Sequence, residues 1–402
     1  MAPRRRIPSW SVSEPQSDED GALFEGVRVL DLTNVLAGPF CTYQLALQGA
    51  SVLKVEVPGG GDLARHLGAD PDLNGRGIGS SFLAQNAGKR SLALDLKSHE
   101  GQATFIRLVT EADVLVENFR PGVLARLGFP WSRLRDLNPG LVYCVISGFG
   151  ADGPMADRPA YDQVIQGLSG MMDITGRPDD GPTRIGFPVC DTFGGMTACF
   201  AVAAALLRRS RTGRGAHLDV SMLDSALTSL GWAASNWLIA GESPQRMGND
   251  NFTACPSGAF PTKEGLLNIA ANQQLQFEVL CQAIGRADLI RDGRFATRAG
   301  RLAHRSELNG EVIRALASST AQEWEELLTP LGVPAARVLT VPEAFALDQV
   351  AGRGTVATLD DIPGTERPLR VVTAGFHVDG RPSDPPAMPP ALGADREGFW
   401  QK

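Results

Sequence analysis

Asp191 is the residue whose surroundings could most readily do chemistry. It follows the apolar run Ile185–Cys190 and stands shortly before the pair Gly194-Gly195. The next segment, Met196–Leu207, is rich in Ala and contains neither Pro nor Gly, which predicts a buried helix that begins at its first residue. We therefore expect the Asp191 carboxylate at or just before a helix N-terminus, where the macrodipole favours its charged form and backbone N–H groups can hold an anion.

Two interpretations fit this position of Asp191. Asp is among the most preferred N-cap residues, so position alone favours a purely structural carboxylate. The alternative is a nucleophile, because a carboxylate can attack an acyl group and so divide one difficult step into two. Gly194 and Gly195 would then let the backbone approach a ligand closely. The residues by themselves leave both interpretations open.

Length and composition limit the classes of protein to consider. The chain has 402 residues, enough for two domains, and is 43% hydrophobic and 21% charged, as is ordinary for a soluble globular protein. Its net charge of −7 argues against a general nucleic-acid binder. The longest wholly apolar run, Cys199–Leu207, is too short to span a membrane, so we expect no membrane partner.

The cysteines and the N-terminus bear on the compartment. The six cysteines include no C-x-x-C pair, so the sequence predicts neither a metal site nor a redox pair, and a reducing, cytoplasmic location fits better than a disulfide framework. Residues 1–22 carry three arginines, several serines and an acidic cluster but no apolar stretch. We therefore expect a disordered tail there and not a secretory signal.

The first part of the chain predicts a parallel α/β sheet. Val27–Leu32 and Ser51–Val57 are rich in β-formers, and between them lies a helical segment that ends near Leu47. A strand, a helix and a second strand in this order form a βαβ unit. The turn after the first strand contains Ala37-Gly-Pro in place of G-x-G-x-x-G, which argues against an enzyme that uses NAD.

Two longer motifs resemble those of the family III CoA-transferases, which include formyl-CoA transferase, carnitine CoA-transferase and 2-methylacyl-CoA racemase. The first motif in that family joins a Tyr-Asp or His-Asp pair, a Ser-Gly, a glycine-rich turn, and an Asp before a glycine pair. The matching residues are Tyr161-Asp162, Ser169-Gly170, the turn Gly176–Gly181, and Asp191 with Gly194-Gly195. The second motif is Glu117–Phe129, which reads ENFRPGVLARLGF. Together the matches fill residues 24 to about 224.

The resemblance implies an α/β fold. It consists of a Rossmann-like large domain with a parallel sheet and a smaller α+β domain. We expect the large domain over residues 23–225, the small domain with its linkers over 226–345, and a C-terminal return to the large domain over 346–402. The resemblance also implies a homodimer whose two chains pass through each other as interlocked rings.

The resemblance implies that coenzyme A binds to the large domain as a substrate, with no further cofactor. The loop at Val35, Leu36 and Ala37 would meet its nucleotide part, chiefly through backbone groups. The adjacent cations Lys89 and Arg90 suit its phosphates, although they could equally be a solvated surface pair. The remaining implied contacts are Asn118, at the end of a strand, and Arg126, on the short helix that follows.

Two chemistries within the family must be separated. The racemase uses a His-Asp pair and a nearby Glu to move the α-proton of an acyl-CoA, whereas the transferase uses the Asp as a nucleophile. Here the His position, 30 residues before Asp191, holds Tyr161, and the Glu falls at about Gln274. Because Tyr, with an ordinary pKa of about 10, is a poor proton shuttle near neutrality, the transferase is favoured. A non-catalytic protein that binds coenzyme A or nicotinamide is a third possibility.

The transferase mechanism implied by the resemblance takes CoA from an acyl-CoA thioester to a carboxylic acid through an aspartyl-CoA thioester. Backbone N–H groups around Gly194 and Gly195 would stabilise the tetrahedral intermediates, and Tyr161 would bond the acyl group unless it is a core aromatic. The region around Met247–Gly258 is not the glycine tract of formyl-CoA transferase, which disfavours formyl-CoA and oxalate. Arg184 could bind a second carboxylate, so we expect succinyl-CoA as donor and a dicarboxylate as acceptor.

Overall fold

The computed structural model describes residues 22–395. All but the last residue of the predicted tail, 1–22, therefore lies outside the described residues. The described residues form two compact units, one of residues 22–146, 195–220 and 357–395, the other of residues 147–194 and 221–356. The second unit thus includes residues 147–194, which the sequence had led us to expect in the large domain.

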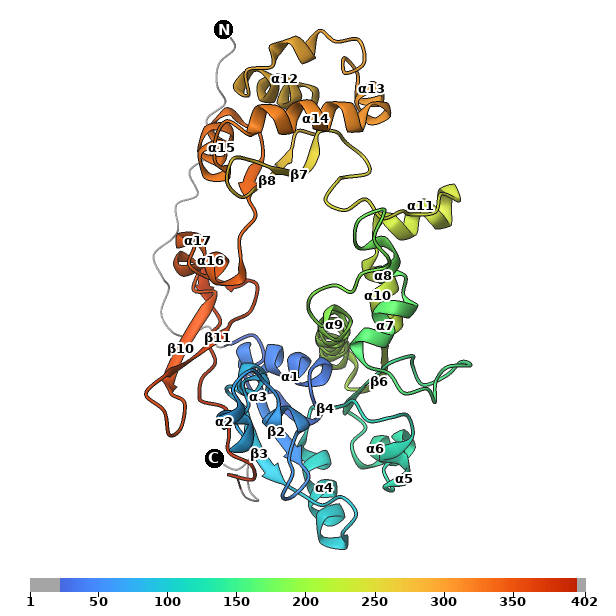
Figure 1. Ribbon diagram of the computed structural model, residues 1–402. Coiled ribbons are helices and arrows are strands. Elements are labelled where there is room, and N and C mark those ends of the chain that lie inside the picture. The colour runs from blue at the N-terminus through green and yellow to red at the C-terminus, as the bar shows by residue number, and fades with distance from the viewer. Residues whose placement is uncertain (1–21, 396–402) are drawn as a thin grey trace. The chain divides into compact units, whose positions relative to one another are not determined.

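A six-stranded sheet is the centre of the first unit (Figure 1). Its strands are β1 (Arg28–Leu32), β2 (Ser51–Glu56), β3 (Arg90–Ala93), β4 (Val114–Glu117), β5 (Val142–Ser147) and β6 (Ala216–Ser221). The spatial order is β3-β2-β1-β4-β5-β6, and β1 to β5 pair in parallel, which confirms the predicted parallel sheet. This is the Rossmann order, in which the strand order reverses between β1 and β4.

The central strands are buried on both faces, as parallel strands between helix layers must be. β4 is apolar up to its last residue, and β1 is apolar after its first residue, Arg28, except for Asp31, which is wholly buried. Helix α4 (His99–Glu111) covers one face with Phe105 and Leu108, which join a core that contains Leu30 and Leu115. A buried charge in the middle of such a strand needs a partner, and its partners lie near the carboxyl edge of the sheet.

The first unit contains further helices besides α4. α1 (Ala37–Leu47) buries every residue except Phe40, so it is a core helix without a polar face. The shorter elements are η1 (Leu63–His66), α2 (Pro71–Gly75), α3 (Ser80–Asn86), α5 (Val123–Arg126) and α6 (Trp131–Leu137).

The C-terminal part of the chain completes the first unit. It forms β10 (Val356–Asp361), β11 (Pro368–Val372), β12 (His377–Val378) and β13 (Arg381–Pro382). Leu369 and Val371 of β11 belong to one buried cluster with Tyr43 and Phe82, which come from α1 and α3. The Tyr43 hydroxyl also donates to the carbonyl oxygen of Val372 at 2.9 Å.

Helix α9 (Val189–Thr212) begins well before Met196, where the sequence had predicted its start. That expectation was wrong because Gly194 and Gly195, taken as a break, lie inside the helix, and both are buried. A Cβ at Gly194 would lie 3.0 Å from Met222, and one at Gly195 would overlap the carbonyl oxygen of Ala37. The glycines are therefore required by close packing and not by a turn.

α9 is also the only helix among the described residues that is long and apolar enough to cross a membrane. The criterion is one of length and composition alone, and the core helix of a soluble protein meets it as well. The absence of a membrane partner remains an expectation.

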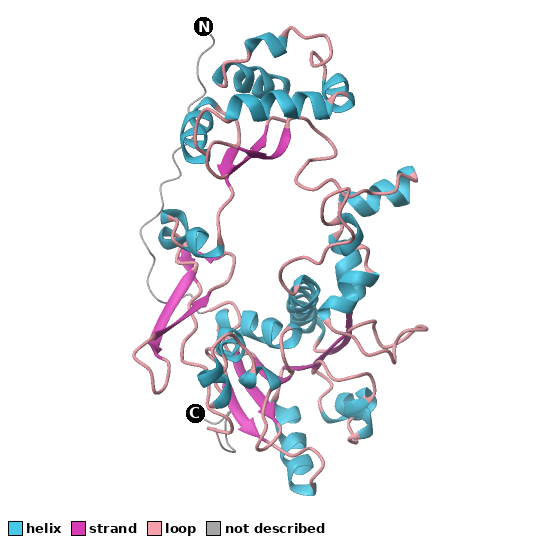
Figure 2. Cartoon of the chain, in the orientation of Figure 1, coloured by secondary structure: helices cyan, strands magenta, loops and turns pink. Residues whose placement is uncertain are grey.

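The second unit contains a three-stranded antiparallel sheet of β7 (Ser257–Pro261), β8 (Leu266–Ala270) and β9 (Ala335–Arg337) (Figure 2). Helices α12 (Gln274–Ala283), α14 (Arg305–Leu316) and α15 (Ala321–Leu328) share its core, which contains Phe277, Leu308 and Trp324. β7 and β8 pair as an antiparallel hairpin.

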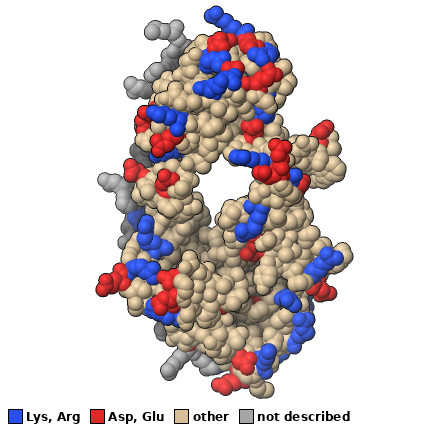
Figure 3. Space-filling model, viewed as in Figure 1, with Lys and Arg blue, Asp and Glu red and all other residues tan. Residues whose placement is uncertain are grey.

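The remaining elements of the second unit are short helices. They are α7 (Asp162–Leu168), α8 (Met171–Ile174), α10 (Met222–Ser229), α11 (Trp232–Ala240), η2 (Ala287–Ile290), α13 (Arg298–Ala303), η3 (Thr329–Leu331), α16 (Val341–Phe345) and α17 (Asp348–Gly352). Figure 3 shows acidic and basic side chains interspersed over the part of this unit that carries α13 and α14. The ion pairs between α12 and α13 in sequence include Arg286–Asp288 and Arg294–Asp292.

The packing of α9 gives a stability prediction. Gly→Ala inside a helix normally stabilises it by about 0.5–1 kcal/mol, but at Gly195 the added methyl group meets a backbone oxygen that cannot move cheaply. We expect Gly195→Ala to lower the free energy of unfolding by about 1–3 kcal/mol in urea titrations. Gly310→Ala in α14 is the control, because its nearest neighbour is the flexible end of Arg314 at 3.6 Å. Equal effects of the two substitutions would contradict the packing argument.

Candidate active site

Asp191 lies in the first turn of α9, and another residue caps that turn. Asp162, the first residue of α7, accepts hydrogen bonds at Oδ1 from the backbone N–H of Cys190 at 2.7 Å and of Asp191 at 3.3 Å. The N-cap role considered for Asp191 therefore belongs to Asp162. The Asp191 carboxylate is not needed to satisfy the helix end, which leaves it available for chemistry.

The electrostatic surroundings of Asp191 differ from those expected. Burial, and then the negative charge of Asp162, raise the pKa of Asp191 to about 7. We had expected the helix N-terminus to keep this carboxylate fully ionised, and that expectation was wrong. The helix field is worth at most about 2 kcal/mol, so removal of water and a second carboxylate can outweigh it. Near neutral pH a substantial fraction of Asp191 is protonated.

A buried amide holds Asp162 in place. Gln166 is wholly buried, and its Nε2 donates to Asp162 Oδ2 at 2.7 Å and to the carbonyl oxygen of Phe187 at 3.2 Å. Its Oε1 accepts from the backbone N–H of Ile185 at 2.9 Å. The same side chain therefore fixes both the capping carboxylate and the segment that leads into α9. Arg184 lies just before this segment, with Nη2 4.0 Å from Asp162 Oδ2.

Tyr161 and the glycine pair have roles that differ from simple expectation. Tyr161 directly precedes α7, and its side chain is 73% exposed, so it is not a core aromatic. Gly194 and Gly195 lie beyond the first four residues of α9, whose N–H groups are the ones that a helix leaves without an internal partner. Their predicted role as oxyanion donors does not agree with this position. The first-turn amides of Cys190 and Asp191 face Asp162 instead.

A separate cleft of about 420 Å³ lies in the first unit at the carboxyl edge of the sheet. Its walls come from the residues that follow β1, β2, β3 and β4, which include the point where the strand order reverses. The lining residues are Leu32, Thr33, Asn34, Val55, Glu56, Val57, Pro58, Gly61, Leu94, Asp95, Leu96, Lys97, Phe119, Val123 and Leu127. Ligands of open α/β sheets bind at such a switch point.

The loop after β1 forms one wall of this cleft. Asn34 and Asn118 exchange two hydrogen bonds of 2.8 Å, from Asn34 N to Asn118 Oδ1 and from Asn118 Nδ2 to Asn34 O. This pair joins the ends of β1 and β4 across the switch point. Val35 has a φ of 67°, in the left-handed region that a β-branched residue rarely adopts. Asn118 thus positions the loop, and Leu36 and Ala37 continue it into α1.

The three predicted cations have different surroundings. Lys89 is buried, and its Nζ donates to Asp31, Thr42 and the carbonyl oxygen of Pro39 at 2.8–3.0 Å, so it does not present its charge to a ligand here. Arg90 is 57% exposed and lies 3.8 Å from Asp395. Arg126 ends α5 and is exposed, next to the cleft residue Leu127.

Sequence reasoning missed Lys97, an exposed cation in the cleft wall. The signal was available, because the run Leu94-Asp-Leu-Lys97 directly follows β3, and the rule that singled out Asn118 applies equally to the end of that strand. Among residues 22–395, no group of three His, Cys, Asp or Glu side chains is placed to hold a metal ion.

Comparisons with known proteins agree with this geometry. Residues 24–396 match the model of CoA-transferase family III. An acetyl-CoA:oxalate CoA-transferase of Acetobacter aceti is 38% identical over 93% of this chain and 94% of its own length. A succinate–glutarate CoA-transferase of Agrobacterium fabrum is 40% identical over 86% and 88%. The crystal structure of a CAIB/BAIF family protein from Brucella suis superposes with a TM-score of 0.82 at 33% identity, over 93% of this chain and 97% of that one.

The fold and the two sites therefore define an enzyme that transfers coenzyme A between acids. The chain belongs to CoA-transferase family III.

The raised pKa of Asp191 gives a prediction for activity. If the ionised carboxylate is the nucleophile, kcat/KM for the acyl-CoA should rise with pH through one ionisation near 7 and fall about tenfold per pH unit below it. Asp162→Asn keeps an oxygen for the cap but removes one of the two causes of the shift. It should therefore move the profile to lower pH, while the exposed Asp180→Asn should not. A wild-type profile that is flat through neutrality would contradict this assignment.

Proposed function

We propose that this enzyme moves CoA from a dicarboxylic acyl-CoA, succinyl-CoA, to a second dicarboxylate through a thioester on Asp191. The observation that carries the proposal is the division of roles at the start of α9. Asp162 accepts the hydrogen bonds of the helix end, so the Asp191 side chain takes no part in the cap. Asp191 is a partly buried carboxylate with a pKa raised to about 7. A carboxylate without its water shell is a better nucleophile than a hydrated one.

The reaction needs only acyl transfers in sequence. Asp191 attacks the thioester carbon of the donor, and CoA leaves as the thiolate, which gives a mixed anhydride. The thiolate then attacks the Asp191 carbonyl carbon, releasing the donor acid and forming the aspartyl-CoA thioester. The acceptor carboxylate attacks the aspartyl carbonyl carbon of this thioester and expels the CoA thiolate, which gives a second mixed anhydride. The thiolate then attacks the acceptor carbonyl carbon, which forms the acceptor acyl-CoA and releases the Asp191 carboxylate. No net redox change or metal is required, so coenzyme A is needed only as a substrate.

Asp162 acts on this sequence in two ways. Its hydrogen bonds fix the direction of the first turn of α9, and its charge opposes a second negative charge on Asp191. Conversion of Asp191 into a neutral anhydride or thioester removes that repulsion. The ground state is thus destabilised relative to the covalent intermediates, which favours attack. Tyr161, which is exposed and adjacent to Asp162 in sequence, would bond the acyl oxygen.

The cleft at the sheet edge suits the nucleotide part of coenzyme A. Its walls are mainly apolar, as stacking of an adenine requires, and Lys97 supplies a cation at the rim. Arg126, at the end of α5, adds a second cation. The Asn34–Asn118 pair would hold the loop against the ligand.

The acid substrates are inferred from one residue and from relatives. Arg184 lies beside Asp162 and could pair with the distal carboxylate of a dicarboxylic acyl group. Several relatives are named for succinyl-CoA together with glutarate, D-citramalate or mesaconate. A relative named for acetyl-CoA and oxalate makes oxalate the acceptor to test against these.

A racemase reaction is less well supported. The amide oxygen of Gln274, at the place expected for the racemase Glu, accepts from Arg301 at 2.8 Å, and its Nε2 donates to Glu278 at 2.9 Å. An amide held in this way offers no base for the α-carbon.

The proposed assembly is a homodimer of interlocked chains in the cytoplasm. Helix α11 supports a partner, because all its residues except Ser235 and Asn236 are apolar and yet none is buried in the single chain. Trp232, Leu238 and Ile239 are 70–85% exposed. Exposed apolar surface of this kind marks an interface. All six cysteines lie in the described residues without a disulfide, which suits a reducing compartment.

The covalent step is directly testable. Asp191→Asn keeps the shape of the side chain but removes the charge, so it should fold normally and lose activity by at least about 10³-fold, as nucleophile variants do. Wild-type enzyme incubated with acyl-CoA and then hydroxylamine should carry a hydroxamate at Asp191, detected by peptide mass mapping, and the Asn variant should not. Full turnover by the variant, or no label on Asp191, would sink the assignment.

The coenzyme cleft gives a separate prediction. Lys97→Ala and Arg126→Ala should each raise the KM for the acyl-CoA by about tenfold or more, the usual loss for a charged hydrogen bond, and leave the KM of the acceptor nearly unchanged. Arg135→Ala, on the exposed side of α6, is the matched control. If Lys97 meets the 3′-phosphate, its variant should no longer distinguish CoA esters from 3′-dephospho-CoA esters. An unaltered acyl-CoA KM would remove the residue from the site.

A further inference from the structure

We propose that Asp62, together with Lys54, is a positioning residue that holds the loop Thr33–Leu36 in its ligand-binding conformation. The inference rests on the proposed function, because it assigns this loop to the coenzyme cleft. It goes further in naming two buried side chains that touch no ligand but set the strength of binding.

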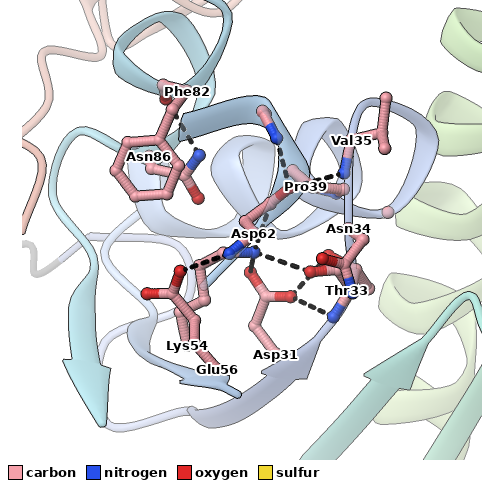
Figure 4. A network of polar contacts seen from close by, with 12 residues as sticks. Asp31, Thr33, Asn34, Val35, Pro39, Lys54, Glu56, Asp62, Phe82 and Asn86 are labelled. Carbon is pink, nitrogen blue, oxygen red and sulfur yellow. Dashed lines mark hydrogen bonds and ion pairs between the residues drawn. The ribbon is translucent and has the colours of Figure 1, made fainter. Parts of the chain in front are cut away.

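Asp62 and Lys54 hold the loop from both sides of Asn34 (Figure 4). Asp62 Oδ1 accepts from the backbone N–H of Val35 at 2.9 Å, and Lys54 Nζ donates to the carbonyl oxygen of Thr33 at 2.7 Å. Asp62 Oδ2 and Lys54 Nζ are themselves 2.9 Å apart. One ion pair therefore fixes the two backbone groups that flank a single residue of the cleft wall.

The held conformation is one that the loop would not choose by itself. Val35 has a φ of 67°, where its β-branched side chain crowds the backbone. Such strain persists only where surrounding structure enforces it, and it gathers at functional sites. Without the bond from its N–H to Asp62, Val35 would relax towards extended φ values. Thr33 and Asn34, which line the cleft just before Val35, would then lose their fixed position.

The ion pair belongs to a balanced buried network. Its members are the acids Asp31, Glu56 and Asp62 and the bases Lys54, Arg65 and Lys89, all less than 6% exposed. Lys54 Nζ also lies 4.0 Å from Asp31, which Lys89 contacts at 3.0 Å, and Glu56 pairs with Arg65 at 2.7 Å. Burial alone would lower the pKa of Lys54, but Asp31, Asp62 and Glu56 together raise it, so Lys54 stays charged.

The network reaches the cleft directly through one member, Glu56, which lines it. It also reaches the cleft through backbone, because Lys54 bonds the carbonyl oxygen of the lining residue Thr33, and the lining residue Gly61 directly precedes Asp62. A role confined to general stability would not require the acceptor of Val35 N–H to be a buried charge. A charged acceptor makes the stronger bond, which is what a strained backbone needs.

The test measures coenzyme A binding by calorimetry on the full chain. Asp62→Asn keeps the size of the side chain but weakens the bond to Val35, and we expect the Kd for CoA to rise about tenfold or more, since binding must restore the strained loop. The kcat at saturating acyl-CoA should stay within about twofold, because the chemistry at Asp191 is not addressed. Val35→Gly should rescue the variant, since Gly adopts this φ without strain.

Stability and binding can be separated with a charge-balanced variant. Should Asp62→Asn fail to fold, the pair Asp62→Asn with Lys54→Met removes one charge of each sign and leaves the network neutral. We expect this double variant to fold and still to bind CoA weakly. A wild-type Kd in either variant, or no recovery with Val35→Gly, overturns the positioning role. A wild-type protein that binds no CoA overturns the proposed function itself, which is a distinct outcome.

Discussion

Six charged side chains are buried below the carboxyl edge of the sheet, and their signs cancel. Asp31 lies within the central strand β1, where water cannot reach it, so each neighbouring charge is constrained by the need to neutralise it. Burial would raise the pKa of Asp31, but Lys54 and Lys89, helped by hydroxyl groups, hold it well below its usual range. Because these bases also bond the carbonyl oxygens of Thr33 and Pro39, neutralising Asp31 shapes the loop between β1 and α1.

At the start of α9 burial and neighbouring charge also shift the pKa of a carboxylate, but here they raise it. Asp162 and Asp191 carry the same sign, and the nearest cation recorded for Asp162, Arg184, is 4.0 Å away. With no balanced network there, burial and repulsion raise the pKa of Asp191 to about 7. In one region of the chain buried charges of opposite sign fix a loop, and in the other two carboxylates of the same sign leave Asp191 with a raised pKa. Paired charges stabilise a conformation, whereas a like-charged pair stores energy that a covalent step can release.

Local patterns in the sequence were enough to predict much of this. The predicted strands Val27–Leu32 and Ser51–Val57 correspond to β1 and β2, and motif spacing singled out Asp191 as the candidate nucleophile. The start of α9 could not be predicted, because its cap is a side chain from a helix nearly thirty residues earlier in the chain. Lys89 was predicted to contact phosphate, and Lys97 was overlooked, for a related reason. A cation beside a matching motif looks exposed in sequence, and only the fold shows that Lys89 meets a buried Asp31 while Lys97 reaches the cleft.

The return of the C-terminal segment to the first unit has a consequence for biosynthesis. Leu369 and Val371 complete a buried cluster whose other members, Tyr43 and Phe82, leave the ribosome more than 280 residues earlier. At about 5–20 residues per second, synthesis of the chain takes on the order of 20–80 s, and for most of that time the apolar side of α1 and α3 has no cover. The nascent chain therefore exposes this apolar surface for most of its synthesis, and the cluster can close only after Val371 has been added.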